Sequence, residues 1–130
     1  MWILRSSMVR YLMVGVVNTI VGLSAIWLAL RLLDASAAAA NAMGYGVGFL
    51  CSFLLNRTWT FRHRGGASTG LIRYILVCLV AYVANLIVVL QLGEHFGRSD
   101  LVPQIAGMVT YTLLAYAGSR LYAFPISMAR

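Results

Sequence analysis

Charged residues divide the chain into four long apolar runs, at residues 11–30, 35–56, 74–93 and 101–119. Each run is 19 to 22 residues long, and at about 1.5 Å of rise per helical residue each can cross a hydrocarbon core of roughly 30 Å. Lipid offers no partner for backbone N–H and C=O groups, and the runs are too long and too weakly alternating to be barrel strands. The pattern therefore predicts an all-α integral membrane protein with four transmembrane helices.

Composition supports this prediction, because the chain is 62% hydrophobic, 10% charged and has a mean hydropathy of +0.86, outside the usual range of soluble domains. The first run could instead be a cleaved signal peptide, since arginines precede it and Ala35, Ser36 and Ala37 follow it. A stretch near 20 residues exceeds the roughly 7 to 15 residues of a signal peptide's apolar region. We therefore interpret it as a membrane span.

Arginines gather on one side of the predicted membrane, and the other side carries only Arg31 and Arg98 together with the three acids Asp34, Glu94 and Asp100. By the positive-inside rule the arginine-rich side is cytoplasmic, which predicts a multi-pass protein of the cytoplasmic (inner) membrane with both termini inside. The net charge of +7 is then a topology signal, and we expect no nucleic-acid partner. The cytoplasmic set is Arg5, Arg10, Arg57, Arg62, Arg64, Arg73, Arg120 and Arg130.

Two short patterns recur at the same offset of 63 residues. Residues 10–12 (RYL) return as 73–75 (RYI), and residues 57–61 (RTWTF) return as 120–124 (RLYAF). A shared spacing predicts a duplication of a two-helix hairpin, with both copies entering and leaving on the cytoplasmic side, unlike the inverted repeats of many transporters. The prediction is a single membrane domain over residues 1–130, with repeat 1 at about 9–61, a cytoplasmic loop at about 62–70 and repeat 2 at about 71–124.

Small residues recur every fourth position in the second run and form a stripe that ends at Asn56. Such a stripe lets two helix backbones approach closely, which promotes helix association in lipid. The sequence leaves open whether the stripe meets another helix of this chain or a second protomer. Its members are Ser36, Ala40, Gly44, Gly48 and Ser52.

The chain lacks the residue sets of common catalytic sites. Its three acids fall on the predicted outer side, and His63 and His95 lie on opposite sides of the membrane. Cys51 and Cys78 lie inside predicted helices without C-x-x-C spacing. We therefore expect no enzymatic activity, no cofactor and no metal.

Four arginines stand at matching helix ends. Arg57 and Arg120 end the second and fourth predicted helices, and Arg10 and Arg73 begin the first and third. We expect the fold to bring these ends together at the phosphate level of the inner leaflet, where a planar guanidinium can bind phosphate through two hydrogen bonds. The alternative is simple anchoring to lipid headgroups.

Amides inside the predicted membrane also have two interpretations. Asn18 and Asn85 face hydrocarbon unless a partner satisfies them, so they either join helices or, with Asn41, Asn56 and Gln104, line a polar path for a headgroup. No intramembrane acid is present to couple transport to protons, so any transport should run downhill or be pulled by consumption of the transported molecule on the far side. The aromatic residues beside the arginines are interfacial anchors or line a groove for a lipid chain or sugar: Trp59, Phe61, Tyr122 and Phe124.

Several short elements occur together, at residues 10–11 (RY), 14–15 (VG), 18–19 (NT), 40–41 (AN) and 53–61 (FLLNRTWTF). With them the chain resembles the GtrA-like family of small four-helix membrane proteins over nearly its whole length. The F-x-x-N-R-x-W-x-F element is the most specific part of the resemblance. In the second repeat Ser119 replaces the asparagine before Arg120.

The resemblance implies a role in moving polyprenyl-phosphate-linked sugars across the cytoplasmic membrane, for modification of surface polymers such as O-antigen, teichoic acid or arabinan. The implied partners are the lipid-linked sugar and a membrane glycosyltransferase, with phosphate on Arg57 and Arg120 and amides on the sugar hydroxyls. One alternative is a membrane anchor that recruits the glycosyltransferase. Another is a small multidrug exporter, although that family needs a glutamate that the first helix lacks. A bundle of four helices is also compatible with a homo-oligomer.

Overall fold

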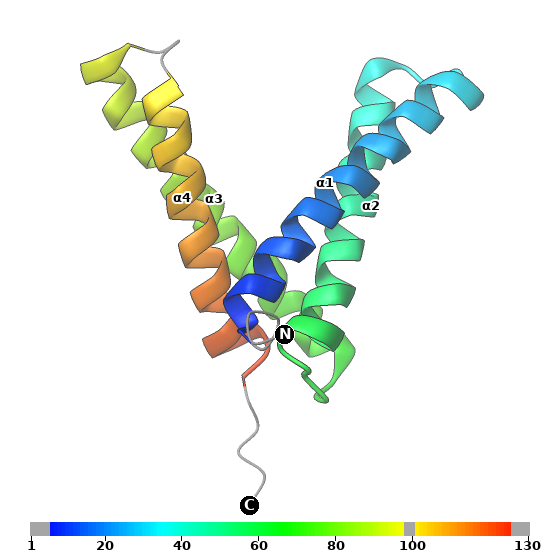
Figure 1. The fold of residues 1–130 in the computed structure, drawn as a ribbon. Helices are drawn as coiled ribbons and strands as arrows, with labels where there is room; N and C mark the ends of the chain where they lie inside the picture. The colour runs from blue at the N-terminus through cyan, green and yellow to red at the C-terminus, as the bar shows by residue number, and fades with distance from the viewer. Residues whose placement is uncertain (1–5, 98–100, 126–130) are drawn as a thin grey trace, which may run out of the picture. The chain divides into compact units, whose positions relative to one another are not determined.

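The computed structural model describes residues 6–97 and 101–125, and this part of the chain is entirely helical apart from short turns. Four of the charged residues that predicted the orientation in the membrane lie outside the described residues: Arg5, Arg98, Asp100 and Arg130. Figure 1 shows the helices in chain order. They are α1 (Ser7–Leu32), α2 (Ala37–Leu55), the π-helical turn η2 (Asn56–Thr60), α3 (Ala67–Phe96), α4 (Leu101–Gly118) and the π-helical turn η3 (Ser119–Ala123).

The four predicted membrane helices are confirmed. With the π turns included, the segments Ser7–Leu32, Ala37–Thr60, Ala67–Phe96 and Leu101–Ala123 are long and apolar enough to cross a membrane. They form two compact units, Met1–Arg62 and His63–Arg130. Each unit is a helical hairpin, α1 beside α2 in the first and α3 beside α4 in the second (Figure 1).

Helices α1 and α3 begin before the apolar runs that predicted them. α1 begins at Ser7, ahead of Arg10, and α3 begins at Ala67, ahead of Arg73. A helix passes through such positions because the long arginine stem packs along apolar surface while the charged head reaches water or headgroups. Ala67, Ser68 and Thr69, which we expected in the loop, therefore lie in the first turn of α3.

The small-residue stripe of α2 packs against α1 of the same hairpin. Ala40, Gly44 and Gly48 are buried. A Cβ atom added at Gly44 would lie 2.8 Å from the carbonyl oxygen of Gly22 and would also meet the side chain of Ile26. The two backbones thus approach as closely as glycine allows, which is how helices associate when lipid supplies no hydrophobic drive.

The second hairpin repeats this contact at the same offset. Gly107 of α4 stands 63 residues after Gly44 and is also buried. A Cβ atom there would meet Asn85 and Val89, which stand 63 residues after the two residues that contact Gly44. The same close approach therefore holds both hairpins.

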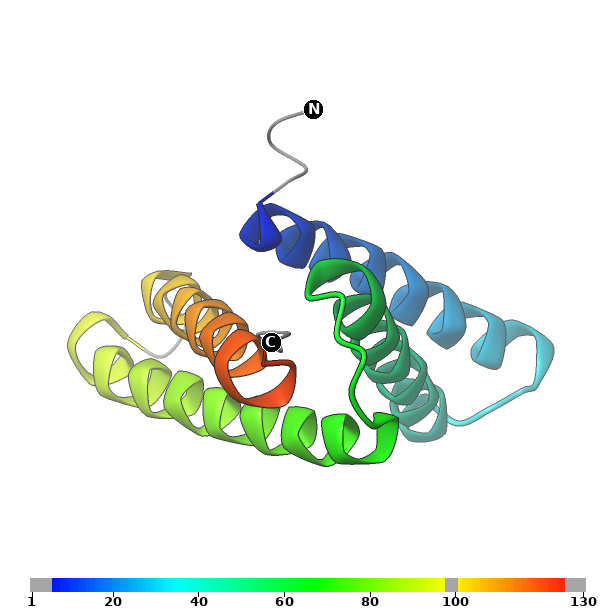
Figure 2. The same ribbon diagram turned by 90° about the horizontal axis from the view of Figure 1, so that it is seen from below.

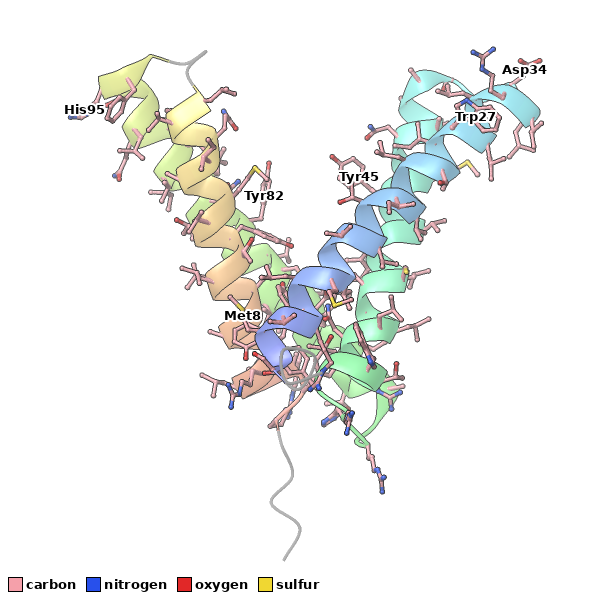
Figure 3. The ribbon with its side chains drawn as sticks, viewed as in Figure 1. Met8, Trp27, Asp34, Tyr45, Tyr82 and His95 are labelled. Carbon is pink, nitrogen blue, oxygen red and sulfur yellow. The ribbon has the colours of Figure 1, made fainter. Side chains whose placement is uncertain are left out.

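Most large apolar side chains point away from the partner helix. Trp27, Tyr45 and Tyr82, labelled in Figure 3, are 58%, 73% and 55% exposed. Only 11% to 22% of the most apolar window of each span is buried within the protein. Such helices satisfy their own backbone and leave their apolar side chains to lipid.

The glycine contact in the first hairpin yields a stability prediction. Gly44→Ala should lower the free energy of unfolding by about 1–3 kcal/mol, because the new methyl group meets a backbone carbonyl that cannot move aside. Unfolding of the purified protein in mixed micelles by added SDS measures this. Gly46→Ala is the matched control, since a Cβ atom there meets nothing within 4 Å, and it should not destabilise the protein. Equal stability of the two variants would contradict this packing.

Candidate functional site at the arginine-bearing helix ends

Helices α2 and α4 each end in a single π-helical turn, which appears as a widened coil in Figure 2. The N–H of Phe61 donates to the carbonyl of Asn56 at 2.9 Å, and that of Phe124 donates to the carbonyl of Ser119 at 2.7 Å. π-helical turns are rare and often occur at functional sites. Both turns lie on the repeated sequence element and are related by the offset of 63 residues.

In the first hairpin, the start of α1 is tied to the π turn of α2. Nη2 of Arg10 donates a hydrogen bond to the carbonyl oxygen of Thr60 at 2.8 Å. The ring of Tyr11 lies 6.3 Å from the ring of Phe61, measured between centroids. The arginine therefore satisfies a carbonyl in the last turn, where an intrahelical N–H partner is missing.

The second hairpin has a corresponding contact. Nη1 of Arg73 lies 3.5 Å from the carbonyl oxygen of Tyr122, and its guanidinium carbon stands 5.3 Å from the centroid of the Tyr122 ring. The distance to the ring is within the range of a cation–π contact. The rings of Tyr74 and Phe124 lie 5.7 Å apart, and Phe124 also contacts the ring of His63. Each hairpin thus brings the arginine of its first helix to the π turn of its second.

The two arginines within the π turns differ in environment. Arg57 is half-buried on η2. Arg120 is exposed on η3, and its Nη1 donates to the hydroxyl of Tyr116 at 3.2 Å. Arg10 contacts the π turn that carries Arg57, and Arg73 contacts the π turn that carries Arg120. Two of the four predicted phosphate ligands therefore lie at one end of each hairpin. A meeting of all four stays a prediction.

The predicted amides take up several positions. The Oδ1 atom of Asn18 would lie 2.7 Å from a Cβ atom at Gly48, and Asn85 packs in the same way on Gly107. These two asparagines therefore lie at helix contacts within their hairpins. Asn56 is 1% exposed and its Nδ2 donates to the hydroxyl of Ser52 at 3.2 Å. Asn41 and Gln104 are exposed.

The four predicted interfacial aromatics separate into two kinds. Phe61 and Phe124 are 9% and 0% exposed and belong to the cores of their hairpins. Trp59 and Tyr122 are 37% and 48% exposed. Only these last two retain surface for a lipid chain or a sugar.

Sequence reasoning missed three polar groups at this end of the hairpins. Ser52 binds the amide of Asn56. The hydroxyl oxygens of Thr60 and Ser119 are buried, with no hydrogen-bond partner among the described residues. The sequence signals were that Thr60 lies inside the first copy of the repeated element and that Ser119 stands directly before the second copy. In the described part of the chain, no three His, Cys, Asp or Glu side chains gather as a metal site.

This arrangement defines a multi-pass membrane protein whose polar groups gather where the helices of each hairpin end. Comparison with known proteins identifies its family. The model described as "GtrA/DPMS, transmembrane domain" matches residues 10–124, and the chain belongs to this family. The family supports a role related to the handling of polyprenyl-phosphate sugars and is generally non-catalytic.

A curated relative is the "Uncharacterized membrane protein YngA" of Bacillus subtilis (strain 168). It is 27% identical over 120 residues, which cover 92% of this chain and 80% of that protein. The match extends over both hairpins.

The contact between Arg10 and the π turn predicts a further stability effect. Arg10→Gln should lower the free energy of unfolding by about 1.5–3 kcal/mol, because it removes a charge-assisted hydrogen bond to the half-buried end of α2. SDS-induced unfolding measures the difference. Arg64→Gln removes the same charge from an exposed loop position and should change stability by less than about 0.5 kcal/mol. Equal effects of the two variants would show that charge alone, rather than this hydrogen bond, matters.

Proposed function

We propose that the protein translocates a polyprenyl-phosphate-linked monosaccharide across the cytoplasmic membrane, for modification of a cell-surface polysaccharide. Both termini then lie in the cytoplasm, and the arginine-bearing helix ends lie at the inner leaflet. One observation carries the proposal. In each hairpin an arginine at the start of the first helix contacts a carbonyl of the π turn, and the same π turn carries a second arginine. Membership of the GtrA/DPMS family supports it.

The chemistry of this task requires a site that binds an anion and gives it up again. An ionised group at the bilayer centre costs from about 3 to more than 10 kcal/mol, so a lipid phosphate needs a protein partner to cross at a useful rate. A guanidinium offers a planar fork of N–H donors that matches phosphate oxygens. Arg57 is the principal candidate because it is half-buried within the π turn.

The exposed aromatics fit the rest of such a lipid. Trp59 and Tyr122 stand beside the arginines on the same π turns and retain exposed ring surface. Such rings pack well against isoprenoid or sugar C–H groups at a membrane interface. No covalent bond changes in this scheme, so the protein acts without catalysis, and consumption of the lipid on the far side sets the direction.

A second candidate function is a membrane anchor for a polyprenyl-phosphate glycosyltransferase. The family is described as a transmembrane domain, and the large apolar surface of the hairpins suits lateral association with another membrane protein. In this scheme a pull-down recovers an intact complex with the enzyme, while the protein in liposomes moves no lipid.

Transport is tested in liposomes with a fluorescent polyprenyl-phosphate glucose and dithionite quenching of the label on the outer leaflet. Wild-type protein should speed exchange between leaflets, and Arg57→Ala should lower the rate at least tenfold, because the phosphate loses its principal cation. Arg31→Ala is the control: it removes an exposed arginine from the last turn of α1, at the other end of the hairpin, and should retain transport. Reconstituted amounts must match. Full activity of Arg57→Ala would show that Arg57 does not bind the phosphate.

A further inference from the structure

We propose that the headgroup site lies in the first hairpin, and that the second hairpin has kept the fold but lost part of the polar site. This inference rests on the proposed function. It assigns the residues that bind the phosphate and the sugar to the first hairpin alone. It comes from pairs of positions that the offset of 63 residues makes equivalent. At these pairs the backbone is alike and the side chains differ.

The arginines of the π turns are the first unequal pair. Arg57 is half-buried, whereas Arg120 is exposed and donates to Tyr116. The position equivalent to Tyr116 in the first hairpin is Phe53, whose ring carries no hydroxyl. Tyr116 therefore gives Arg120 a hydroxyl acceptor within its own helix, and Phe53 has no hydroxyl at the equivalent position.

Thr60 forms the second unequal pair with Ala123. The Thr60 side chain is 1% exposed, and its hydroxyl has no hydrogen-bond partner among the described residues. The carbonyl of the same residue accepts the hydrogen bond of Arg10, so this hydroxyl lies close to a cation. A buried hydroxyl without a partner destabilises the folded protein, and Ala123 avoids this cost in the second hairpin. A ligand oxygen that accepts from this hydroxyl would offset it.

Asn18 and Asn56 extend the polar set deeper into the first hairpin. Asn56 is replaced by Ser119 in the second hairpin, and Asn18 by Ala81. The Oδ1 atom of Asn18 is buried without a hydrogen-bond partner in the described part of the chain. Asn18 stands eight residues after Arg10, about 12 Å further along α1. The first hairpin thus carries oxygen acceptors and donors at two depths.

Among the described residues, the second hairpin has one buried side-chain oxygen without a hydrogen-bond partner, the hydroxyl of Ser119. The positions equivalent to Thr60 and Asn18 are the buried alanines Ala123 and Ala81, so this hydroxyl lacks the polar neighbours that Thr60 and Asn18 supply in the first hairpin. The chemistry of the first hairpin fits a phosphate monoanion or dianion at Arg57 and Thr60. The amide oxygen of Asn18 fits a hydroxyl group of an attached sugar.

A matched pair of substitutions tests the assignment. Thr60→Ala and Ser119→Ala each remove one buried hydroxyl without a partner, and neither change should lower the thermal midpoint of the free protein. Binding is measured on detergent-solubilised full-length protein by native mass spectrometry, with farnesyl phosphate as the probe and farnesol as its uncharged counterpart. Thr60→Ala should weaken binding of farnesyl phosphate roughly tenfold. Ser119→Ala should bind it like wild type, and farnesol should not distinguish the two.

Two further variants separate the effect of the hydroxyl group from the effect of the side-chain shape. Thr60→Ser keeps the oxygen and should retain binding, whereas Thr60→Val keeps the shape and should lose it as Thr60→Ala does. A purely structural role of Thr60 would instead change the thermal midpoint and leave the affinity for farnesyl phosphate untouched. Undiminished binding by Thr60→Ala, or equal loss by Thr60→Ala and Ser119→Ala, overturns the assignment.

The outcome is separate from that of the proposed function. Should wild-type protein move no lipid in liposomes while Thr60→Ala alone loses binding, translocation fails and the site in the first hairpin stands. Should lipid move at the wild-type rate in Thr60→Ala and Ser119→Ala alike, translocation stands and the site fails.

Discussion

The close approach of two helix backbones in lipid is the constraint on which the rest of this structure depends. Gly44 brings α2 against the carbonyl of Gly22, at a distance that any side chain would prevent. Because the helices lie this close, the start of α1 reaches the end of α2, and Arg10 can bind the carbonyl of Thr60. The polar site is therefore a consequence of glycine packing several turns away.

The π turns position the side chains of the proposed site at the end where the two helices are in contact. A π turn closes its hydrogen bond over one more residue than an α turn, so the residues that follow are rotated relative to a continued α-helix. Phe61 thereby packs on the ring of Tyr11, while Arg57 stays half-buried at the turn. The equivalent packing of Phe124 on Tyr74 shows the same arrangement in the second hairpin.

Sequence alone predicted the four helices well, because uncharged runs of membrane length have few other structures available. It placed their ends less well, because arginines such as Arg10 and Arg73 mark the boundary of the apolar core and not of the helix. The π turns gave no recognisable signal, since residues 56–60 contain neither glycine nor proline. The burial of Phe61 and Phe124 depends on those turns, so an aromatic beside an arginine looked interfacial from sequence and proved to be core. Thr60 was missed for the same reason.

The division into two compact hairpins also bears on how the protein is made. The first unit ends at Arg62, and its glycine contact, its arginine contact and its aromatic pair all form before that residue. Synthesis runs from the N-terminus, and units with their own core fold as they emerge. The first hairpin can therefore complete its packing in the bilayer while the ribosome is still translating the second, which lowers the risk that a helix of one copy pairs with its counterpart in the other.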